Sequence, residues 1–353
     1  MRGLTFKIST LINYAGGFKE AVAEIKLLEK AGLDVAWVPE AYSFDAPSAM
    51  GYLAAETERV IIASGILPIY TRTPSVLAMT AAGVDYLSDG RAMLGLGASG
   101  PQVVEGFHGL PYTAPVARTR EVIEICRQVW RREKVQYMGD HYQIPLPQDQ
   151  GTGLGKPLKL INNPVRSDIP IAIASLGPAS VAATAELADA WLPAFYTAEA
   201  ADAVWGDALR KGNGKRAGDR APLDIYAGGS VAIGEGTEPL RDRARPGAAL
   251  YIGGMGARSK NFYNDIFSKS GYADEAKIIQ DLYLAGEKKA AEEAIPDDYL
   301  AKSSLIGPEG FVKESLYALR ESGVTSLNVN FAGADAAEST DQCEKLRNLV
   351  DSL

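Results

Sequence analysis

The chain has 353 residues, of which 46% are hydrophobic and 23% charged, so it can form one large domain or two modest ones. A formal net charge of −8 argues against nucleic acid or an acidic membrane as partner, because both require a basic face. With two cysteines and two histidines, we expect neither a disulfide framework nor a metal site. We therefore expect a cytoplasmic protein that acts on small molecules and leaves difficult chemistry to an organic cofactor.

Short apolar runs alternate with longer amphipathic segments in the first part of the chain. This alternation is typical of βαβ units that build a parallel sheet. The predicted strands are Thr5–Ser9, Asp34–Val38, Val60–Ser64 and Ala92–Leu96. The predicted helices are Phe18–Ala31, Pro47–Thr57, one that begins at Pro74, and Val116–Arg132.

The second part of the chain continues the alternation but contains two excursions. The first, at about 135–168, starts as a small hairpin and is rich in Gly and Pro, and the second, at about 239–304, is helical and irregular. Between and after them we expect strands Ile169–Ala174, Ala190–Ala194, part of Leu223–Ile233 and Ser326–Phe331, with helices Pro178–Leu187 and Ser339–Leu353. Eight strands in this order predict a single (β/α)₈ TIM-barrel domain over residues 1–353, because such barrels need about 250 residues without insertions.

A glycine motif follows the fourth predicted strand, where Gly95, Gly97 and Gly100 have GxGxxG spacing. A Rossmann nucleotide site would need a long helix at once and an acidic residue after the next strand. Here PQVVEGFHGLPY intervenes, and Glu121 and Glu124 fall inside a helix. Two interpretations stay open: the glycines turn the chain, or they let the backbone approach a ligand at the barrel mouth.

Other polar residues also fall at the carboxyl ends of predicted strands. Ser175–Pro178 ends a strand and opens a helix, and a helix N-terminus can bind a phosphate group. Glu40 follows the second strand and is either a functional group or a solvated carboxylate. His108 is either an acid or base or a histidine in a structural hydrogen bond. Asp45 is predicted to be a helix N-cap.

Three segments carry a family resemblance: VAWVPEAYSFDA, SGILPIYTRTPSVLAMTAAGVDYLSDGRAMLGLGASGPQVVEGFHGLPY and IPIAIASLGPASVAATAELADAWLP. They resemble the luciferase-like superfamily, specifically the branch that uses the deazaflavin coenzyme F420. That branch includes methylenetetrahydromethanopterin reductase and F420-dependent glucose-6-phosphate dehydrogenase. The resemblance is strongest from Leu33 to Leu192 and weak across the second excursion.

The resemblance implies a barrel of the bacterial luciferase type with a non-prolyl cis peptide at Gly65-Ile66, which supports the back of the deazaflavin ring. It places an acidic group near the ring at Glu40. It places the ribityl phosphate near the loops Gly97–Gly100 and Ser175–Ala179. The implied cofactor-binding residues are Glu40, Gly65, Ile66, Thr73, Gly97, Ala98, Ser99, Gly100, Ser175, Leu176, Gly177, Pro178 and Ala179. The implied substrate contacts are Asn13, Tyr42 and Tyr196.

The sequence departs from the glucose-6-phosphate dehydrogenase branch at two positions. The catalytic histidine of that branch would fall on Ala41, and its acidic partner near Pro101 or Gln102. Glucose 6-phosphate is therefore not the expected substrate.

The expected reaction is hydride transfer between reduced F420 and an unidentified small organic molecule. Glu40, Tyr42 and His108 are the candidates for proton transfer, with Glu40 and His108 as the predicted catalytic residues. The alternatives are an FMN-dependent two-component monooxygenase, or a protein that binds the cofactor without catalysis. Relatives pair through barrel helices, so a homodimer is expected.

Overall fold

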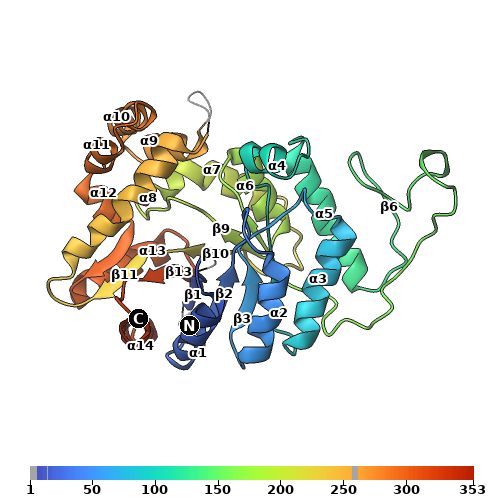
Figure 1. Ribbon diagram of the computed structural model, residues 1–353, viewed down its shortest axis with the longest axis horizontal. Coiled ribbons are helices and arrows are strands. Elements are labelled where there is room, and N and C mark those ends of the chain that lie inside the picture. The colour runs from blue at the N-terminus through green and yellow to red at the C-terminus, as the bar shows by residue number, and fades with distance from the viewer. Residues whose placement is uncertain (1–5, 14, 257–260) are drawn as a thin grey trace.

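The computed structural model describes residues 6–13, 15–256 and 261–353. Within these residues, eight parallel strands form a closed barrel, because the last strand pairs with the first (Figure 1). In barrel order they are β1 (Lys7–Leu11), β2 (Val35–Val38), β3 (Ile61–Ser64), β5 (Ala92–Gly97), β8 (Ile171–Ala174), β9 (Ala190–Leu192), β10 (Asp224–Ala227) and β13 (Ser326–Phe331). The predicted (β/α)₈ barrel is confirmed. The predicted first strand began at Thr5, which lies outside the described residues.

Helices pack around the outside of the barrel. They are α1 (Phe18–Lys30), α2 (Ala46–Glu56), α3 (Pro74–Leu87), α5 (Pro115–Trp130), α6 (Pro178–Leu187), α13 (Glu309–Glu321) and α14 (Ala336–Asp351). In α5 the apolar residues Val122, Ile125 and Val129 share one face and are buried, as their spacing predicts. Asp45 caps α2 by accepting from the backbone N–H of Ser48, which confirms the predicted N-cap. No helix in the described part of the chain is long and apolar enough to cross a membrane.

The strands divide the core into two layers, because successive side chains of a strand point to opposite faces. Residues such as Ile8, Ile62 and Leu327 point outward and pack in the layer shared with the helices. The inward-facing buried residues form a separate cluster: Val35, Trp37, Ala63, Met93, Ala172, Ala190 and Tyr226. This alternation identifies which side chains can line the inside of the barrel.

The end of β3 lies very close to β5. A Cβ atom at Gly95 would be 1.7 Å from the carbonyl oxygen of Ser64, so no other residue fits there. The Ser64 hydroxyl also bonds the backbone N–H and carbonyl of Gly95, both at 2.8 Å. Directly after β3 the Gly65-Ile66 peptide bond is cis, as the family resemblance implies, and β4 (Leu67–Pro68) then pairs with β5. The first glycine of the GxGxxG motif is thus required by strand packing.

The structure differs from the sequence prediction around the seventh strand. That strand is split by Gly228 and Gly229 into β10 and β11 (Ser230–Ile233), which both pair with β13. An unpredicted strand, β12 (Ser304–Gly307), pairs with β11, and α13 follows it. The buried residues Val312, Leu316 and Leu319 give α13 a helical period that the sequence contains. The sixth strand also ends at Leu192 rather than at the predicted Ala194.

The first excursion leaves the barrel beside α3 and α5 and extends far from it (Figure 1). Its predicted hairpin is confirmed by the antiparallel pair β6 (Tyr137–Met138) and β7 (Gln143–Ile144), followed by the short η1 (Gln148–Gln150). Where the chain returns, the guanidinium group of Arg166 pairs with the fully buried carboxylate of Asp85 on α3 and also bonds the carbonyl of Ala92. The excursion is therefore fixed to the barrel at its return point.

The second excursion is a helical unit with its own apolar core. Its elements are η3 (Glu238–Ala244), α8 (Arg245–Ala249), η4 (Leu250–Gly254), α9 (Phe262–Lys269), α10 (Ala273–Leu284), α11 (Lys288–Glu293) and α12 (Asp297–Lys302). Phe267, Ile279 and Tyr299 are buried in this core. The remaining short helices are α4 (Pro101–Gly106), η2 (Asp202–Gly206) and α7 (Asp207–Asn213).

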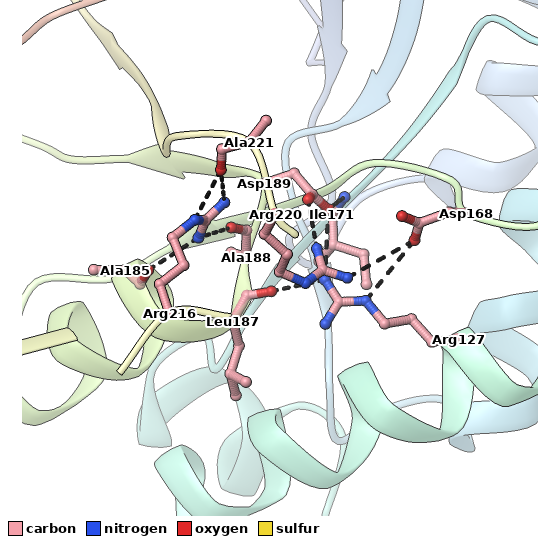
Figure 2. Close-up of polar contacts among 10 residues, drawn as sticks. All are labelled: Arg127, Asp168, Ile171, Ala185, Leu187, Ala188, Asp189, Arg216, Arg220 and Ala221. Carbon is pink, nitrogen blue, oxygen red and sulfur yellow. Dashed lines mark hydrogen bonds and ion pairs between the residues drawn. The ribbon is translucent and has the colours of Figure 1, made fainter. Parts of the chain in front are cut away.

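An arginine cluster ties together segments that precede strands β8, β9 and β10 (Figure 2). The Asp189 carboxylate accepts hydrogen bonds from the backbone N–H of Ile171 at 2.9 Å and from Arg220 at 2.7 Å. Arg216 donates to the carbonyls of Ala185 and Ala188, which end α6. Because these contacts join the end of α6 to the starts of strands, they hold the N-terminal end of the barrel together.

The close approach of β3 to β5 predicts a strong effect of one added methyl group. We expect Gly95→Ala to destabilise the protein by about 3 kcal/mol, since the new Cβ would overlap the Ser64 carbonyl. Gly83→Ala is the matched control, because it adds the same atom to α3 where no atom lies within 4 Å, and it should stabilise by about 1 kcal/mol. Urea unfolding measures both, and equal midpoints for Gly95→Ala and the unsubstituted protein would contradict the packing argument.

Candidate functional site

The predicted site residues come together at the carboxyl end of the barrel. Glu40 follows β2, Gly65 and Ile66 follow β3, Gly97 ends β5, and the 175–179 turn follows β8. These four strands are neighbours in the sheet, so their carboxyl ends meet at one edge of the barrel mouth. Barrel enzymes place their functional groups at this end.

An apolar wall lies at the end of β3. A Cβ atom at Gly65 would be 2.9 Å from Cβ of Trp37 and 3.4 Å from Cδ1 of Leu11, and one at Gly97 would be 2.8 Å from the Ile66 side chain. Trp37 is fully buried, whereas Leu11 faces the barrel interior and is still 42% exposed. Leu11, Gly65 and Ile66 therefore form an accessible apolar surface, with Trp37 behind it, against which a flat ring can lie.

Both oxygens of the Glu40 carboxylate are hydrogen-bonded to protein groups. Its two oxygens accept from Arg72 at 2.5 and 2.8 Å, and one of them also accepts from the backbone N–H of Ala46 at 2.8 Å. The Glu40 side chain is only 8% exposed. The sequence suggested a functional or a solvated carboxylate, but the structure shows a buried ion pair that holds the loop after β2 to the start of α2. Glu40 is thus a positioning residue, and Arg72, its partner, was not singled out from the sequence.

The glycine loop after β5 is shaped by two tyrosines that the sequence analysis did not identify. Ser99 has a positive φ of 58°, and its carbonyl accepts a hydrogen bond from the Tyr112 hydroxyl at 3.3 Å. The ring of Tyr112 lies 5.2 Å from that of Tyr70, whose hydroxyl bonds the carbonyl of Thr113. Burial raises the pKa of Tyr112, so it remains a hydrogen-bond donor at neutral pH.

The predicted phosphate-binding turn leads into α6. The N-cap residue Gly177 offers no side chain to cap the helix, so the first-turn N–H groups are left for another acceptor. Two indole groups hold the turn from behind, because Trp191 donates to the carbonyl of Ser175 at 3.0 Å and Trp205 to that of Leu176 at 3.2 Å. The Ser175 hydroxyl is buried and bonds Thr184 at 2.8 Å. Backbone donors, and not this hydroxyl, are therefore the groups that can hold a phosphate.

Further predicted residues lie on the surface near the mouth. Thr73 is the exposed N-cap of α3. The side-chain oxygen of Asn13 accepts from the backbone N–H of Ala15 at 3.2 Å. Tyr42 is exposed, and its ring lies 6.2 Å from that of Phe107. Their exposure leaves these side chains available to a ligand.

The two remaining predicted residues are His108 and Tyr196. Among the atoms that the structure describes, Nε2 of His108 is buried without a hydrogen-bond partner, and its ring packs edge-on against Phe107. The structural hydrogen bond considered for this histidine is therefore absent at Nε2. Tyr196, predicted to contact substrate, is only 6% exposed and bonds the carbonyl and hydroxyl of Ser322, both at 3.0 Å. That prediction is wrong, because the ring is packed against Trp205 in the core.

The Glu40–Arg72 pair generates a stability prediction. We expect Arg72→Met to destabilise the protein by about 3 kcal/mol, because it leaves a buried carboxylate without its counter-ion. Glu40→Gln should also destabilise the protein. The amide oxygen still accepts from Arg72 Nη2 and from Ala46, but the amide NH2 then faces Arg72 Nη1 as donor against donor. Urea unfolding at pH 7 gives both values, and a loss below about 0.5 kcal/mol for Arg72→Met would show that the pair behaves as a surface ion pair.

Comparison with known proteins gives consistent matches over nearly the whole chain. The model of the luciferase-like monooxygenase family matches residues 4–326. A Mycobacterium tuberculosis protein whose name assigns it to the coenzyme F420-dependent oxidoreductases is 38% identical over 310 residues, 87% of this chain and 89% of that protein. The 5,10-methylenetetrahydromethanopterin reductase of Archaeoglobus fulgidus is 25% identical over 311 residues, 86% of each chain.

A solved structure shows the same fold. The coenzyme F420-dependent tetrahydromethanopterin reductase of Methanopyrus kandleri superimposes with a TM-score of 0.79 over 99% of both chains, at 21% sequence identity. The closed barrel, the family-model match and the 38% identical relative agree with one another. The chain belongs to the luciferase-like monooxygenase family.

Proposed function

We propose that the protein is an F420-dependent oxidoreductase that transfers hydride between the reduced deazaflavin and a small organic substrate. The observation that carries this proposal is the apolar wall of Leu11, Gly65 and Ile66, which lies at the same barrel end as the uncapped N-terminus of α6. The two features fit the flat ring and the phosphate of such a cofactor. The M. tuberculosis relative and the other F420-dependent proteins support the choice of cofactor.

Different parts of the chain have different roles at this site. The apolar wall excludes water from one face of the ring, and the backbone N–H groups at the start of α6 bind the phosphate. When bound, the deazaflavin supplies or accepts the hydride. His108 is the candidate for proton transfer, since its Nε2 has no partner among the described atoms and lies beside the exposed Phe107.

Cofactor binding can be separated from stability by one substitution. Ala179 is exposed in the first turn of α6, and Ala179→Glu puts a carboxylate where the phosphate should bind. We expect the affinity for F420 to fall by more than about tenfold while stability is kept, because an acidic residue suits a helix N-terminus. Fluorescence titration with F420 and with FMN measures the affinity.

Ala273→Glu serves as the matched control, because it adds the same charge at the exposed start of α10. It should leave F420 binding unchanged. Tight binding of FMN without binding of F420 would overturn the proposed cofactor and favour a two-component monooxygenase. Binding of F420 without any substrate-dependent oxidation of its reduced form, across a broad substrate screen, would favour a cofactor carrier.

We also propose that the protein forms a homodimer through α3 and the first excursion. The outer face of α3 exposes Val76, Met79 and Leu87, and the neighbouring excursion exposes Leu154 and Ile161, the latter at 93%. Both segments lie on the same side of the barrel (Figure 1). An apolar surface of this kind marks an interaction site, and a second copy of the chain would cover it symmetrically.

The dimer prediction is tested by light scattering after size-exclusion chromatography. The protein should elute with twice the chain mass of 37.6 kDa. Met79→Lys combined with Leu87→Lys should give the monomer, because it places two charges in the apolar contact. Tyr317→Lys changes an exposed aromatic residue on α13 and should leave the dimer intact. A monomer in the unsubstituted protein would contradict the proposal.

A further inference from the structure

Among the described residues, the inward-facing polar side chains of the strands gather on one side of the barrel. The strands β2, β3, β5, β8 and β9 present apolar or small residues to the interior cluster. On the other side, β13 carries Asn328 and Asn330, and β11 carries Ser230. Asparagine is disfavoured in strands, so two of them at alternating positions of a barrel strand call for a physical reason.

The strand alternation places these three side chains inside the barrel. Leu327 and Val329 point outward into the helix-facing core, so Asn328 and Asn330 point inward. The Ser9 hydroxyl donates to the carbonyl of Leu327 at 2.8 Å and lies 3.3 Å from Oδ1 of Asn328, both across the β1–β13 pair. Ser230 pairs with Asn330 in the β11–β13 register, and its neighbour Val231 also points outward. Asn330 and Ser230 therefore share the interior side of adjacent strands.

Accessibility along β13 shows from which end these groups can be reached. Ser326, the inward residue nearest the amino end of the strand, is fully buried. Asn328 is partly exposed, and Asn330 is exposed. Since exposure increases toward the carboxyl end of the strand, a molecule reaches Asn328 from the barrel mouth.

The hydrogen-bonding capacity of these residues is largely unused. Within the described residues, neither Nδ2 of Asn328 nor the side chain of Asn330 or Ser230 has a hydrogen bond to the protein. Each can donate, and none carries a charge. Such donors can bind an acceptor atom, and a carbonyl oxygen is one that needs no counter-ion from the protein.

This donor surface borders the Leu11 part of the apolar wall and faces its Gly65 and Ile66 part across the barrel mouth. In the closed order of eight strands, β13 lies three positions from β3, and it adjoins β1, the strand that carries Leu11. In Figure 1, β11 and β13 lie to the left of β1, whereas β3 lies to its right. A ring that rests on the wall at Gly65 and Ile66 turns its free face toward Asn328.

We propose that Asn328, together with Asn330 and Ser230, binds the acceptor atom of a neutral carbonyl-type substrate, such as a ketone or an enone, between itself and the ring. This inference rests on the proposed function. When hydride from the reduced cofactor forms the new C–H bond, the carbonyl π electrons move to oxygen. The amide N–H groups of Asn328 stabilise that negative charge until a proton, for which His108 is the candidate donor, reaches the oxygen.

The test uses the full-length protein with F420 bound and 2-cyclohexen-1-one as the carbonyl probe. We expect the probe to change the fluorescence of bound F420 in a saturable way. Asn328→Asp keeps the shape of the side chain and the oxygen near Ser9 but removes both N–H donors. The affinity for the probe should therefore fall by roughly tenfold or more. Asn328→Leu should lower the affinity for the probe to a similar extent. The affinity for F420 should change less than about twofold in both variants, because Asn328 lies three strands away from Gly65 and Ile66.

Asn348→Leu on the exposed face of α14 is the matched control and should bind the probe as the unsubstituted protein does. The absence of saturable probe binding to the F420-loaded protein, or equal probe affinity in Asn328→Asp, would overturn the assignment. A large loss of F420 affinity in both Asn328 variants would also overturn it and place this residue in the cofactor site. Failure of the unsubstituted protein to bind F420 would appear in the first titration and would reject the proposed function itself.

Discussion

The contact between the end of β3 and β5 is the constraint on which the candidate site depends. The carbonyl oxygen of Ser64 occupies the space that a side chain at position 95 would need, and the Ser64 hydroxyl bonds both backbone groups of Gly95. Because the two strands approach this closely, the chain after Ser64 turns over Trp37 and beside Gly97. The apolar wall at Gly65 and Ile66 is the direct consequence, so a packing requirement of the barrel also creates the surface proposed to support the cofactor.

Most polar groups around the mouth support the backbone of the site. Glu40 and Arg72 hold the loop after β2, Tyr112 holds the glycine loop, and Trp191 and Trp205 hold the turn before α6. Each of these contacts fixes a backbone segment whose N–H groups or surface can face a ligand. These contacts fix the positions of the loops, and the groups that would bind a ligand are left free. This is typical of sites built on a rigid scaffold.

The two sides of the barrel interior differ in chemistry, and this difference organises the proposed reaction. The side of β2 to β9 is apolar and suits a flat ring, whereas β11 and β13 bring uncharged donors. Binding a substrate between an apolar ring and a donor surface fixes both its position and the polarity of its reacting bond. Few charged groups are needed, which agrees with the absence from this sequence of the histidine and acid that the glucose-6-phosphate dehydrogenase branch would have near Ala41 and Pro101.

The sequence by itself determined the order of the main barrel strands and helices up to β9, the Asp45 cap and the bounds of α6, because local periodicity and capping residues set these features. Together with the family resemblance it also identified which loops meet at the mouth. Only the tertiary structure decided which way the side chains at these loops face. The Glu40 carboxylate is paired with Arg72, Tyr196 is buried against Trp205, and Asn328 points into the barrel. The physical reason is that these outcomes depend on barrel closure, which brings together residues as distant as Ser9 and Asn328, and no local pattern encodes that contact.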